Sequence, residues 1–221
     1  MLDHIISYIE KYPLSLFESS CVLLPLLVGL LRWNNLYVFL KIIWINCLML
    51  IILDIPMWYL ALHKQNNYLW ANIQEILSAF LWILSFLWLK EKIPRWLIWS
   101  SLLIVLFTSI LDFRFMHYAS WIRVVNRFLF IVLSFIFFTR LLDDLKVKNI
   151  LNYPPFWLIS GLMIMACGTT LIFVFTEVTI SYEDAQDEIY MFFSDINDIL
   201  KIILMFFISV GFWVSKYSYH E

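Results

Sequence analysis

Seven long apolar segments, separated by clusters of charged residues, divide this chain of 221 residues. We place them at 16–33, 36–60, 68–89, 96–113, 119–142, 156–178 and 190–214. A helix needs about 20 mainly apolar residues to cross the hydrocarbon core of a bilayer, and each segment is close to that length. The sequence therefore predicts an all-α polytopic membrane protein with seven transmembrane helices, built as a single transmembrane domain over 1–221.

The composition excludes most other classes of protein. Apolar residues make up 63% of the chain and charged residues only 14%, and the mean hydropathy is +0.84. Soluble domains have far fewer apolar residues. Because the seven segments leave only short loops, we expect no soluble catalytic domain and no nucleic-acid partner; the lipid bilayer is the expected surrounding.

Lysine and arginine set the expected orientation, because these residues collect in the cytoplasmic loops of membrane proteins. If the N-terminus is outside, the inner side holds Arg32, Lys41, Lys90, Lys92, Arg95, Arg140, Lys146, Lys148 and Lys216, and the outer side holds Lys11, Lys64, Arg114, Arg123 and Arg127. The excess predicts an inner (plasma) membrane protein with its N-terminus outside and its C-terminus in the cytoplasm.

Two of the segments contain nearly the same polar phrase. Asn72-Ile-Gln-Glu-Ile-Leu-Ser78 in the third aligns without a gap with Asp195-Ile-Asn-Asp-Ile-Leu-Lys201 in the seventh. Since both segments cross in the same direction, the match predicts a parallel repeat. Repeat one covers 16–89, a linker helix covers 96–113 and repeat two covers 119–214, a three-plus-one-plus-three layout. Chance similarity between apolar helices is the alternative.

Charged and amide side chains within the segments gather in the predicted outer half. Such groups are costly in lipid unless they face a partner or water, so they mark a candidate site. The candidate ligand-binding residues are Glu18, Asp54, Asn72, Glu75, Arg123, Arg127, Asp198 and Lys201. We expect these side chains to surround one outward-opening pocket, with Glu75 and Asp198 at the same depth and facing Arg123 and Arg127.

Two interpretations of this polar layer remain open. It is either a binding site or an internal network of ion pairs that only holds the helices together. For a site, Arg127 and Lys201 suit a carboxylate or phosphate, and Glu75 and Asp198 suit an amine, a cation or a proton. Groups of both signs predict a small polar or zwitterionic ligand.

Several kinds of chemistry lack the residues they need. Lys201 near Asp198 invites comparison with the Schiff-base lysine of retinal proteins, but the spacing is one residue short and the sixth segment lacks the expected aromatic and proline pattern. No HExxH sequence, intramembrane protease motif or glycine-rich phosphate loop occurs. We therefore expect no enzymatic activity, no cofactor and no metal site.

Three phrases carry a resemblance to a known family: Leu23-Leu-Pro-Leu-Leu-Val-Gly-Leu30, Phe156-Trp-Leu-Ile-Ser-Gly161 and Ile208-Ser-Val-Gly-Phe-Trp213. They resemble an uncharacterised family of small seven-helix integral membrane proteins of Bacteroidetes-type bacteria, over nearly the whole chain. The resemblance implies the seven-helix fold and no transferable functional residue. More distantly, the three-plus-one-plus-three layout is similar to transporters of the SWEET type, whose proline-glutamine signature is absent here.

Three functions follow from a seven-helix bundle with a polar interior. The first is a receptor-like sensor whose outward pocket binds a small molecule and whose inner loops, at 90–95 and 140–148, act on a cytoplasmic or membrane signalling partner. The second is a small-solute transporter in which two repeats rock around a central site. The third is a non-catalytic membrane scaffold subunit.

Overall fold

The structure is a computed structural model that describes the backbone of residues 13–89, 93–113, 119–144, 149–180 and 186–216. The α-helices are α2 (Pro13–Cys21), α3 (Leu23–Leu31), α4 (Val38–Leu62), α5 (Tyr68–Ser85), α6 (Arg95–Asp112), α7 (Ser120–Asp144), α8 (Pro154–Ile180) and α9 (Gln186–Val214). Short 3₁₀ turns follow α3 and α5 and precede α8. No strand occurs in the described ranges.

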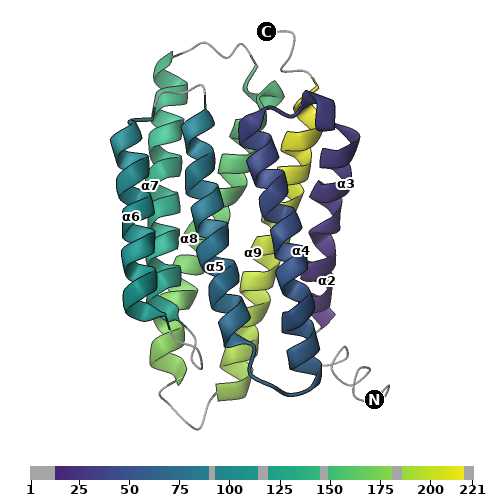
Figure 1. Cartoon of the computed structure of the whole chain (residues 1–221), viewed down its shortest axis with the longest axis vertical. Helices are drawn as coiled ribbons and strands as arrows, with labels where there is room; N and C mark the ends of the chain where they lie inside the picture. Colours follow the sequence, from purple (N-terminus) through teal and green to yellow (C-terminus); the bar gives the residue numbers. More distant parts are fainter. Residues whose placement is uncertain (1–12, 90–92, 114–118, 145–148, 181–185, 217–221) are drawn as a thin grey trace.

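Seven helical spans in the described part of the chain are long and apolar enough to cross a membrane. They match the seven predicted segments to within a few residues, and the first span consists of α2 and α3 together. The spans alternate in direction, so that Pro13 and Val214 lie at opposite ends of the bundle (Figure 1). We call these two ends the Pro13 end and the Val214 end. The all-α seven-helix prediction is confirmed.

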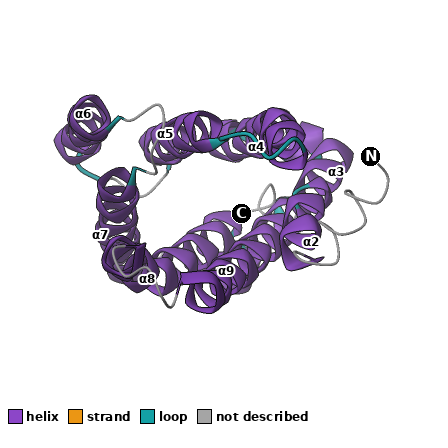
Figure 2. Cartoon of the chain, turned by 90° about the horizontal axis from the view of Figure 1, so that it is seen from below, coloured by secondary structure: helices purple, strands orange, loops and turns teal. Residues whose placement is uncertain are grey.

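The helices form a ring, seen along the bundle axis in Figure 2. Around it lie α2 with α3, then α4, α5, α7, α8 and α9, and α9 packs back against α2 and α3. Helix α6 lies outside this ring and contacts α5 and α7. Its peripheral place is the one expected for a linker helix, and the cyclic order is compatible with a repeat of three spans; the duplication itself stays a prediction.

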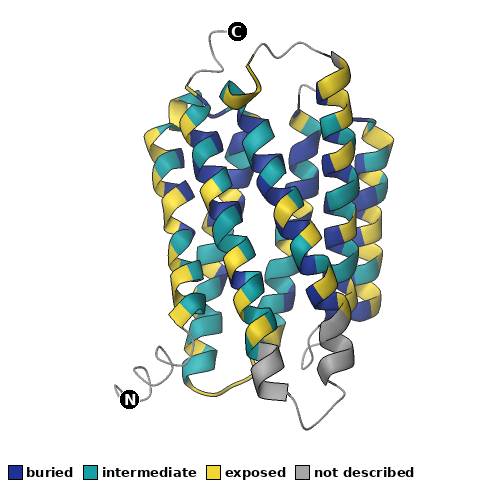
Figure 3. Cartoon of the chain, turned by 180° about the vertical axis from the view of Figure 1, so that it is seen from behind, coloured by how far each residue is buried: buried dark blue, intermediate teal, exposed yellow. Residues whose placement is uncertain are grey.

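Apolar side chains cover the outside of the ring as well as its core. On α6, the side chains of Leu103, Phe107 and Ile110 are each more than 60% exposed. Figure 3 shows the same pattern on the other helices, with exposed residues on the outer faces and buried residues toward the middle. Exposure of so much apolar surface to water would be unfavourable, so these faces fit the hydrocarbon of a bilayer.

Glycine allows the closest helix contact, which joins α8 and α9. A methyl group on Gly161 would come within 2.6 Å of Phe207 Cβ, and one on Gly168 within 2.6 Å of Leu200 Cδ1. Gly211 in turn lies directly against Leu158. Small residues let helices approach closely in membranes, where packing replaces the hydrophobic effect as the main source of association. Gly161 and Gly168 thus allow α8 and α9 to pack closely.

Proline interrupts the first span and lies inside the second. Pro25 has no N–H to donate to the carbonyl of Cys21, and the helix breaks at Val22, between α2 and α3. Beyond the break, α3 is held between α4 and α9, because Gly29 lies against Trp44 and Phe212. Pro56 lies within α4, which continues through it to Leu62. These are the only prolines in the interior of an apolar segment of the sequence.

The glycine contacts predict a large asymmetry between two substitutions on α8. Gly161→Leu should lower the thermal unfolding temperature in detergent, because the new side chain must displace Phe207, and overpacking costs about 1–3 kcal/mol. Ile164→Phe is the matched control, because Ile164 is exposed on the same helix. Equal unfolding temperatures for the two variants, measured by a thiol-reactive dye or by light scattering, would contradict the packing assigned to α8 and α9.

Candidate functional site: a polar cavity inside the ring

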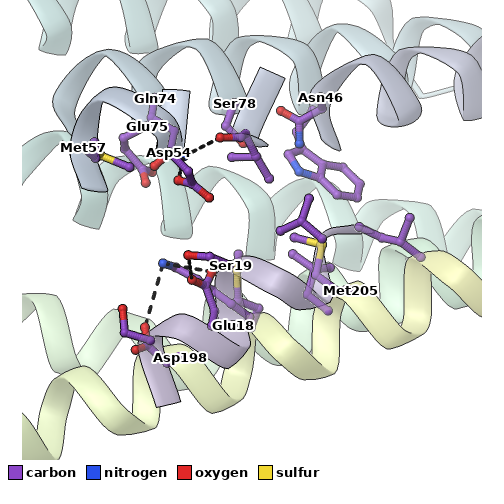
Figure 4. A pocket seen from close by; sticks show the side chains of 18 of the residues that line it. Glu18, Ser19, Asn46, Asp54, Met57, Gln74, Glu75, Ser78, Asp198 and Met205 are labelled. Carbon is purple, nitrogen blue, oxygen red and sulfur yellow. Dashed lines mark hydrogen bonds and ion pairs between the residues drawn. The ribbon is translucent and has the colours of Figure 1, made fainter. Parts of the chain in front are cut away.

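A cavity of about 210 Å³ lies inside the ring. We call it the central cavity. Its lining comes from α2, α4, α5, α7, α8 and α9, and Figure 4 shows the side chains of α4 and α5 facing those of α2 and α9 across it. Sites for drug-sized ligands are typically about 300–1,000 Å³, so the central cavity suits a smaller group.

The central cavity opens toward one end of the bundle only. Its lining includes Ala61 and Asn67, which lie where α4 ends and α5 begins, at the Pro13 end. It reaches past the middle of the bundle to Asn46 and Ile208. Toward the Val214 end the interior is filled by aromatic side chains that are at most 1% exposed, namely Phe39, Phe86, Phe137 and Phe212. The cavity is therefore a blind pocket.

A buried ion pair links α5 and α7 at the edge of the central cavity. Arg127 donates from Nη1 to Glu75 Oε1 at 2.9 Å and from Nη2 to Glu75 Oε2 at 3.1 Å. The Arg127 Nε atom donates to Thr169 Oγ1 on α8 at 3.1 Å, and Asn126 adds a bond from Nδ2 to Glu75 Oε1 at 3.1 Å. Both carboxylate oxygens and three guanidinium nitrogens are thus occupied, and the bidentate pair is neutral as a unit.

A second charged group joins α9 to α2. The Lys201 Nζ atom lies 3.3 Å from Glu18 Oε1 and 4.0 Å from Asp198 Oδ1. The side chain of Lys201 is 35% exposed, whereas those of Glu18 and Asp198 are 13% and 7% exposed. Lys201 therefore bridges two carboxylates on one wall of the central cavity and is still accessible from it.

The opposite wall presents Asp54 on α4. Its Oδ1 atom accepts a hydrogen bond of 2.8 Å from Gln74 Nε2 on α5. Figure 4 shows Asp54 and Gln74 across the cavity from Glu18 and Asp198. A third polar link crosses from α4 to α2, where Trp58 Nε1 donates to Ser19 Oγ at 3.1 Å. Polar groups from four helices thus line the part of the central cavity that is nearest the Pro13 end.

Asn46 lies deeper in the central cavity, and sequence reasoning missed it. It is 1% exposed, and its Oδ1 atom accepts no hydrogen bond within the described structure. Buried amide oxygens almost always have a partner, so an unpartnered one beside a cavity points to a bound donor. The signal was present in the sequence, because Asn46, Leu50, Asp54 and Trp58 follow each other at intervals of four and share one face of α4. All four line the central cavity.

Six of the eight predicted site residues line the central cavity: Glu18, Asp54, Glu75, Arg127, Asp198 and Lys201. Asn72 and Arg123 do not line it. Arg123 Nη1 donates to Asn72 Oδ1 at 3.1 Å and to the Ala119 carbonyl at 2.9 Å, and Arg123 Nη2 donates to the Ala71 carbonyl at 3.3 Å. Arg123 lies one helical turn nearer the Pro13 end than Arg127, and backbone carbonyls occupy its donors. Asn72 and Arg123 thus belong to a network beside the central cavity and not to its lining.

The partner expected for Asp198 also differs. Glu75 meets an arginine of the fifth span as expected, but the ion pair of Asp198 is with Lys201 of its own helix. In the predicted repeat, Asn126 corresponds to Glu18 and Ser78 to Lys201. The Glu75 to Asn126 bond and the Lys201 to Glu18 pair therefore connect corresponding pairs of helices, α5 with α7 and α9 with α2. The repeat stays a prediction. In the first pair of helices the basic group is Arg127 on α7, whereas in the second pair it is Lys201 on α9, the counterpart of α5.

The charges of the central cavity do not balance. With the Glu75 and Arg127 pair counted as neutral, the charged groups left in the described lining are the carboxylates of Glu18, Asp54 and Asp198 and the single ammonium of Lys201. The described residues contain no cluster of three His, Cys, Asp or Glu side chains that could hold a metal ion. Spread over two walls, the carboxylates suit an organic group that bears positive charge better than a bare ion.

Comparisons with known proteins give no relative to guide the assignment. No protein family model, no curated protein and no solved structure matches this chain. The functional argument therefore rests on the geometry of the central cavity.

The Glu75 and Arg127 pair predicts non-additive effects on stability. Glu75→Gln or Arg127→Gln alone should lower the free energy of unfolding by about 3 kcal/mol, because each leaves one buried charge without its partner. The double variant should lose less than the sum, because no lone charge remains. Unfolding titrations with sodium dodecyl sulfate in mixed micelles measure the four free energies.

Arg140→Gln serves as the control for these variants, because Arg140 is an exposed arginine near the end of the same helix. It should change the free energy of unfolding little. Strictly additive losses for Glu75→Gln and Arg127→Gln would show that the ion pair does not hold α5 to α7.

Proposed function

We propose that this chain is a receptor-like sensor of the bacterial plasma membrane that binds a small molecule bearing an amine or another cationic group in the central cavity. The observation that carries the proposal is the lining itself. Three carboxylates face one ammonium, and the amide oxygen of Asn46 at the bottom of the cavity accepts no hydrogen bond in the described structure. An ammonium group carries positive charge and suits the carboxylates, and a second hydrogen-bond donor on the ligand would meet Asn46, which lies two helical turns deeper on α4 than Asp54.

The charged side chains that are still accessible to a ligand narrow the ligand class predicted from the sequence. Arg127 was expected to suit a ligand carboxylate or phosphate, but its guanidinium already binds Glu75 and Thr169. Lys201 remains accessible for a negative group. A zwitterion with its ammonium between Asp54 and Asp198 and its anionic group at Lys201 fits the central cavity. A simple cation uses the carboxylates and leaves Lys201 without a ligand group.

The blind end of the central cavity supports a sensor. The central cavity opens at the Pro13 end, which we place outside the cell, and the aromatic packing at the Val214 end closes the other side. Arg95 and Arg140 are exposed at the Val214 end, where a signalling partner would bind. The remaining basic residues of the predicted partner surface, Lys90, Lys92, Lys146 and Lys148, lie outside the described residues.

One observation favours the small-solute transporter as a second candidate. The helical hydrogen bonding of the first span is interrupted at Val22, within one turn of the lining residues Glu18 and Ser19, although Val22 keeps helical dihedral angles (φ −63°, ψ −25°). Helical segments interrupted by proline or glycine mark the substrate sites of many secondary transporters. A scaffold role, the third candidate, does not explain why the ammonium of Lys201 is accessible from the central cavity.

Binding of small amines tests the proposal. Asp198→Asn should weaken the binding of radiolabelled methylammonium or ethanolamine to the purified protein by about tenfold or more, because a charged hydrogen bond is lost. Lys201→Met should strengthen it, because the carboxylates of Glu18 and Asp198 lose their competing cation. Scintillation proximity binding in nanodiscs measures both effects.

Asp195→Asn is the matched control, since Asp195 lies one turn before Asp198 on α9 and is exposed outside the central cavity. It should bind amines as the unaltered protein does. Equal losses for Asp195→Asn and Asp198→Asn, or no saturable binding of any small amine, would overturn the assignment of the central cavity.

Flux separates the sensor from the transporter. Proteoliposomes that bind a labelled amine should take up no more of it than protein-free vesicles, because the Val214 end is closed. Saturable uptake that falls in Asp198→Asn and persists in Asp195→Asn would replace the sensor with the transporter. Inside-out and right-side-out vesicles, sorted by a cysteine label at Lys64→Cys, assign the direction.

A further inference from the structure

A second hollow lies on the outside of the bundle, between the first and second spans. It has a volume of about 440 Å³ and is lined by Leu16, Ser19, Ser20 and Leu23 on one side and Ile51, Asp54, Ile55 and Trp58 on the other. We call it the side groove. Its walls are mainly apolar, and Leu23 and Ile55 are 51% and 66% exposed on the surface that faces the bilayer.

The side groove and the central cavity share three residues. Ser19, Asp54 and Trp58 line both. The hydrogen bond from Trp58 Nε1 to Ser19 Oγ, 3.1 Å long, lies at the boundary between the side groove and the central cavity and links α4 to α2. Asp54 lies beside this boundary with its carboxylate bonded to Gln74 on the cavity side. A charged group at the bottom of a lipid-facing groove is costly unless something polar reaches it.

The ring is least tightly packed at this boundary. Helix α2 packs against α9 and α3, and α4 packs against α5 and α3, so that α2 and α4 contact each other little. Figure 2 shows α2 beside α9 and set away from α4. The chain's two interior prolines, Pro25 and Pro56, both lie in these spans, and each removes one backbone hydrogen bond from the helix. The contact between α2 and α4 in this half of the bundle is thus the easiest one in the ring to widen.

We infer that the central cavity receives its ligand from the bilayer through the side groove, and that this ligand is an amphiphile with an amine or other cationic headgroup and an alkyl chain. The inference rests on the proposed function and names the ligand class of the same site. The headgroup lies between Asp54 and Asp198, and the chain lies in the side groove.

The two linings support this division of the ligand. The central cavity is lined by charged and amide side chains among others, whereas the side groove is lined mainly by apolar ones. A water-soluble amine would fill the first and leave the second to lipid chains. An amphiphile fills both, and its headgroup meets the carboxylates at the depth where they are found, about 10 Å below the Pro13 end.

Three radiolabelled probes test the inference with the whole protein in phosphatidylcholine nanodiscs: methylammonium, decylamine and decanol. Ile55→Trp narrows the side groove from α4, and Ser20→Trp narrows it from α2. Each should weaken decylamine binding by about tenfold. Methylammonium binding should stay within about twofold, because neither residue lines the central cavity. Partition of decylamine into the bilayer is the same for every variant and cancels in the comparison.

Ile52→Trp is the matched control, because Ile52 is exposed on α4 but does not line the side groove. It should bind decylamine as the unaltered protein does. Asp54→Asn should weaken both amines, and decanol should show no saturable binding, since it lacks the cationic group.

The outcomes separate the inference from the proposed function. Decylamine binding that is unchanged in Ile55→Trp and Ser20→Trp but weakened in Asp54→Asn would overturn entry through the side groove and leave an amine site fed from water. Decanol binding as tight as that of decylamine would overturn headgroup recognition. Binding of neither amine would overturn the proposed function itself.

Discussion

The ion pair between Glu75 and Arg127 joins α5 and α7, two neighbouring helices of the ring that have few other contacts. Helices α5 and α7 pack less closely than α7 with α8 or α8 with α9, and this bidentate pair is the strongest link between them. A lone charge in the middle of a membrane helix costs about 2.5–3.5 kcal/mol on insertion scales, so each residue requires the other. Thr169 and Asn126 also bond to this pair, so that it links α5, α7 and α8 at one edge of the central cavity.

The other charged side chains of the central cavity lie on two opposite walls. Asp54, Asp198 and Lys201 cannot all meet within one network, because they project from opposite walls. Each is partly satisfied by a neighbour, at Gln74 for Asp54 and at Glu18 for Lys201, and the remaining capacity for hydrogen bonds is directed inward. A network that served only to hold helices together would leave fewer of these groups exposed to a cavity. The arrangement thus favours binding over a purely structural role.

The sequence predicted the seven spans and most of the polar layer because both depend on local composition. A charge such as Glu75 or Lys201 is conspicuous among Leu, Ile and Phe, and its depth follows from counting along one helix. The partners of these charges depend on how helices rotate about their axes, which the apolar residues on every face of α4 and α8 do not reveal. Arg123 and Arg127 share one face of α7, yet one turn of difference gives the first to backbone carbonyls and the second to the central cavity. Asn46 was missed because an amide is less conspicuous than a charge.

The unequal distribution of glycine and proline gives the ring one stiff half and one compliant half. Gly161, Gly168 and Gly211 allow α8 and α9 to pack closely, whereas Pro25 and Pro56 each remove one backbone hydrogen bond from the first and second spans. Trp44 Nε1 donates a hydrogen bond of 3.1 Å to the Leu26 carbonyl, one residue beyond Pro25, and so ties the second span to the first. The first span also packs against α9, and Arg32 lies over the ring of Trp213 there. Any movement of the first span relative to α9 must therefore displace the contact between Arg32 and Trp213.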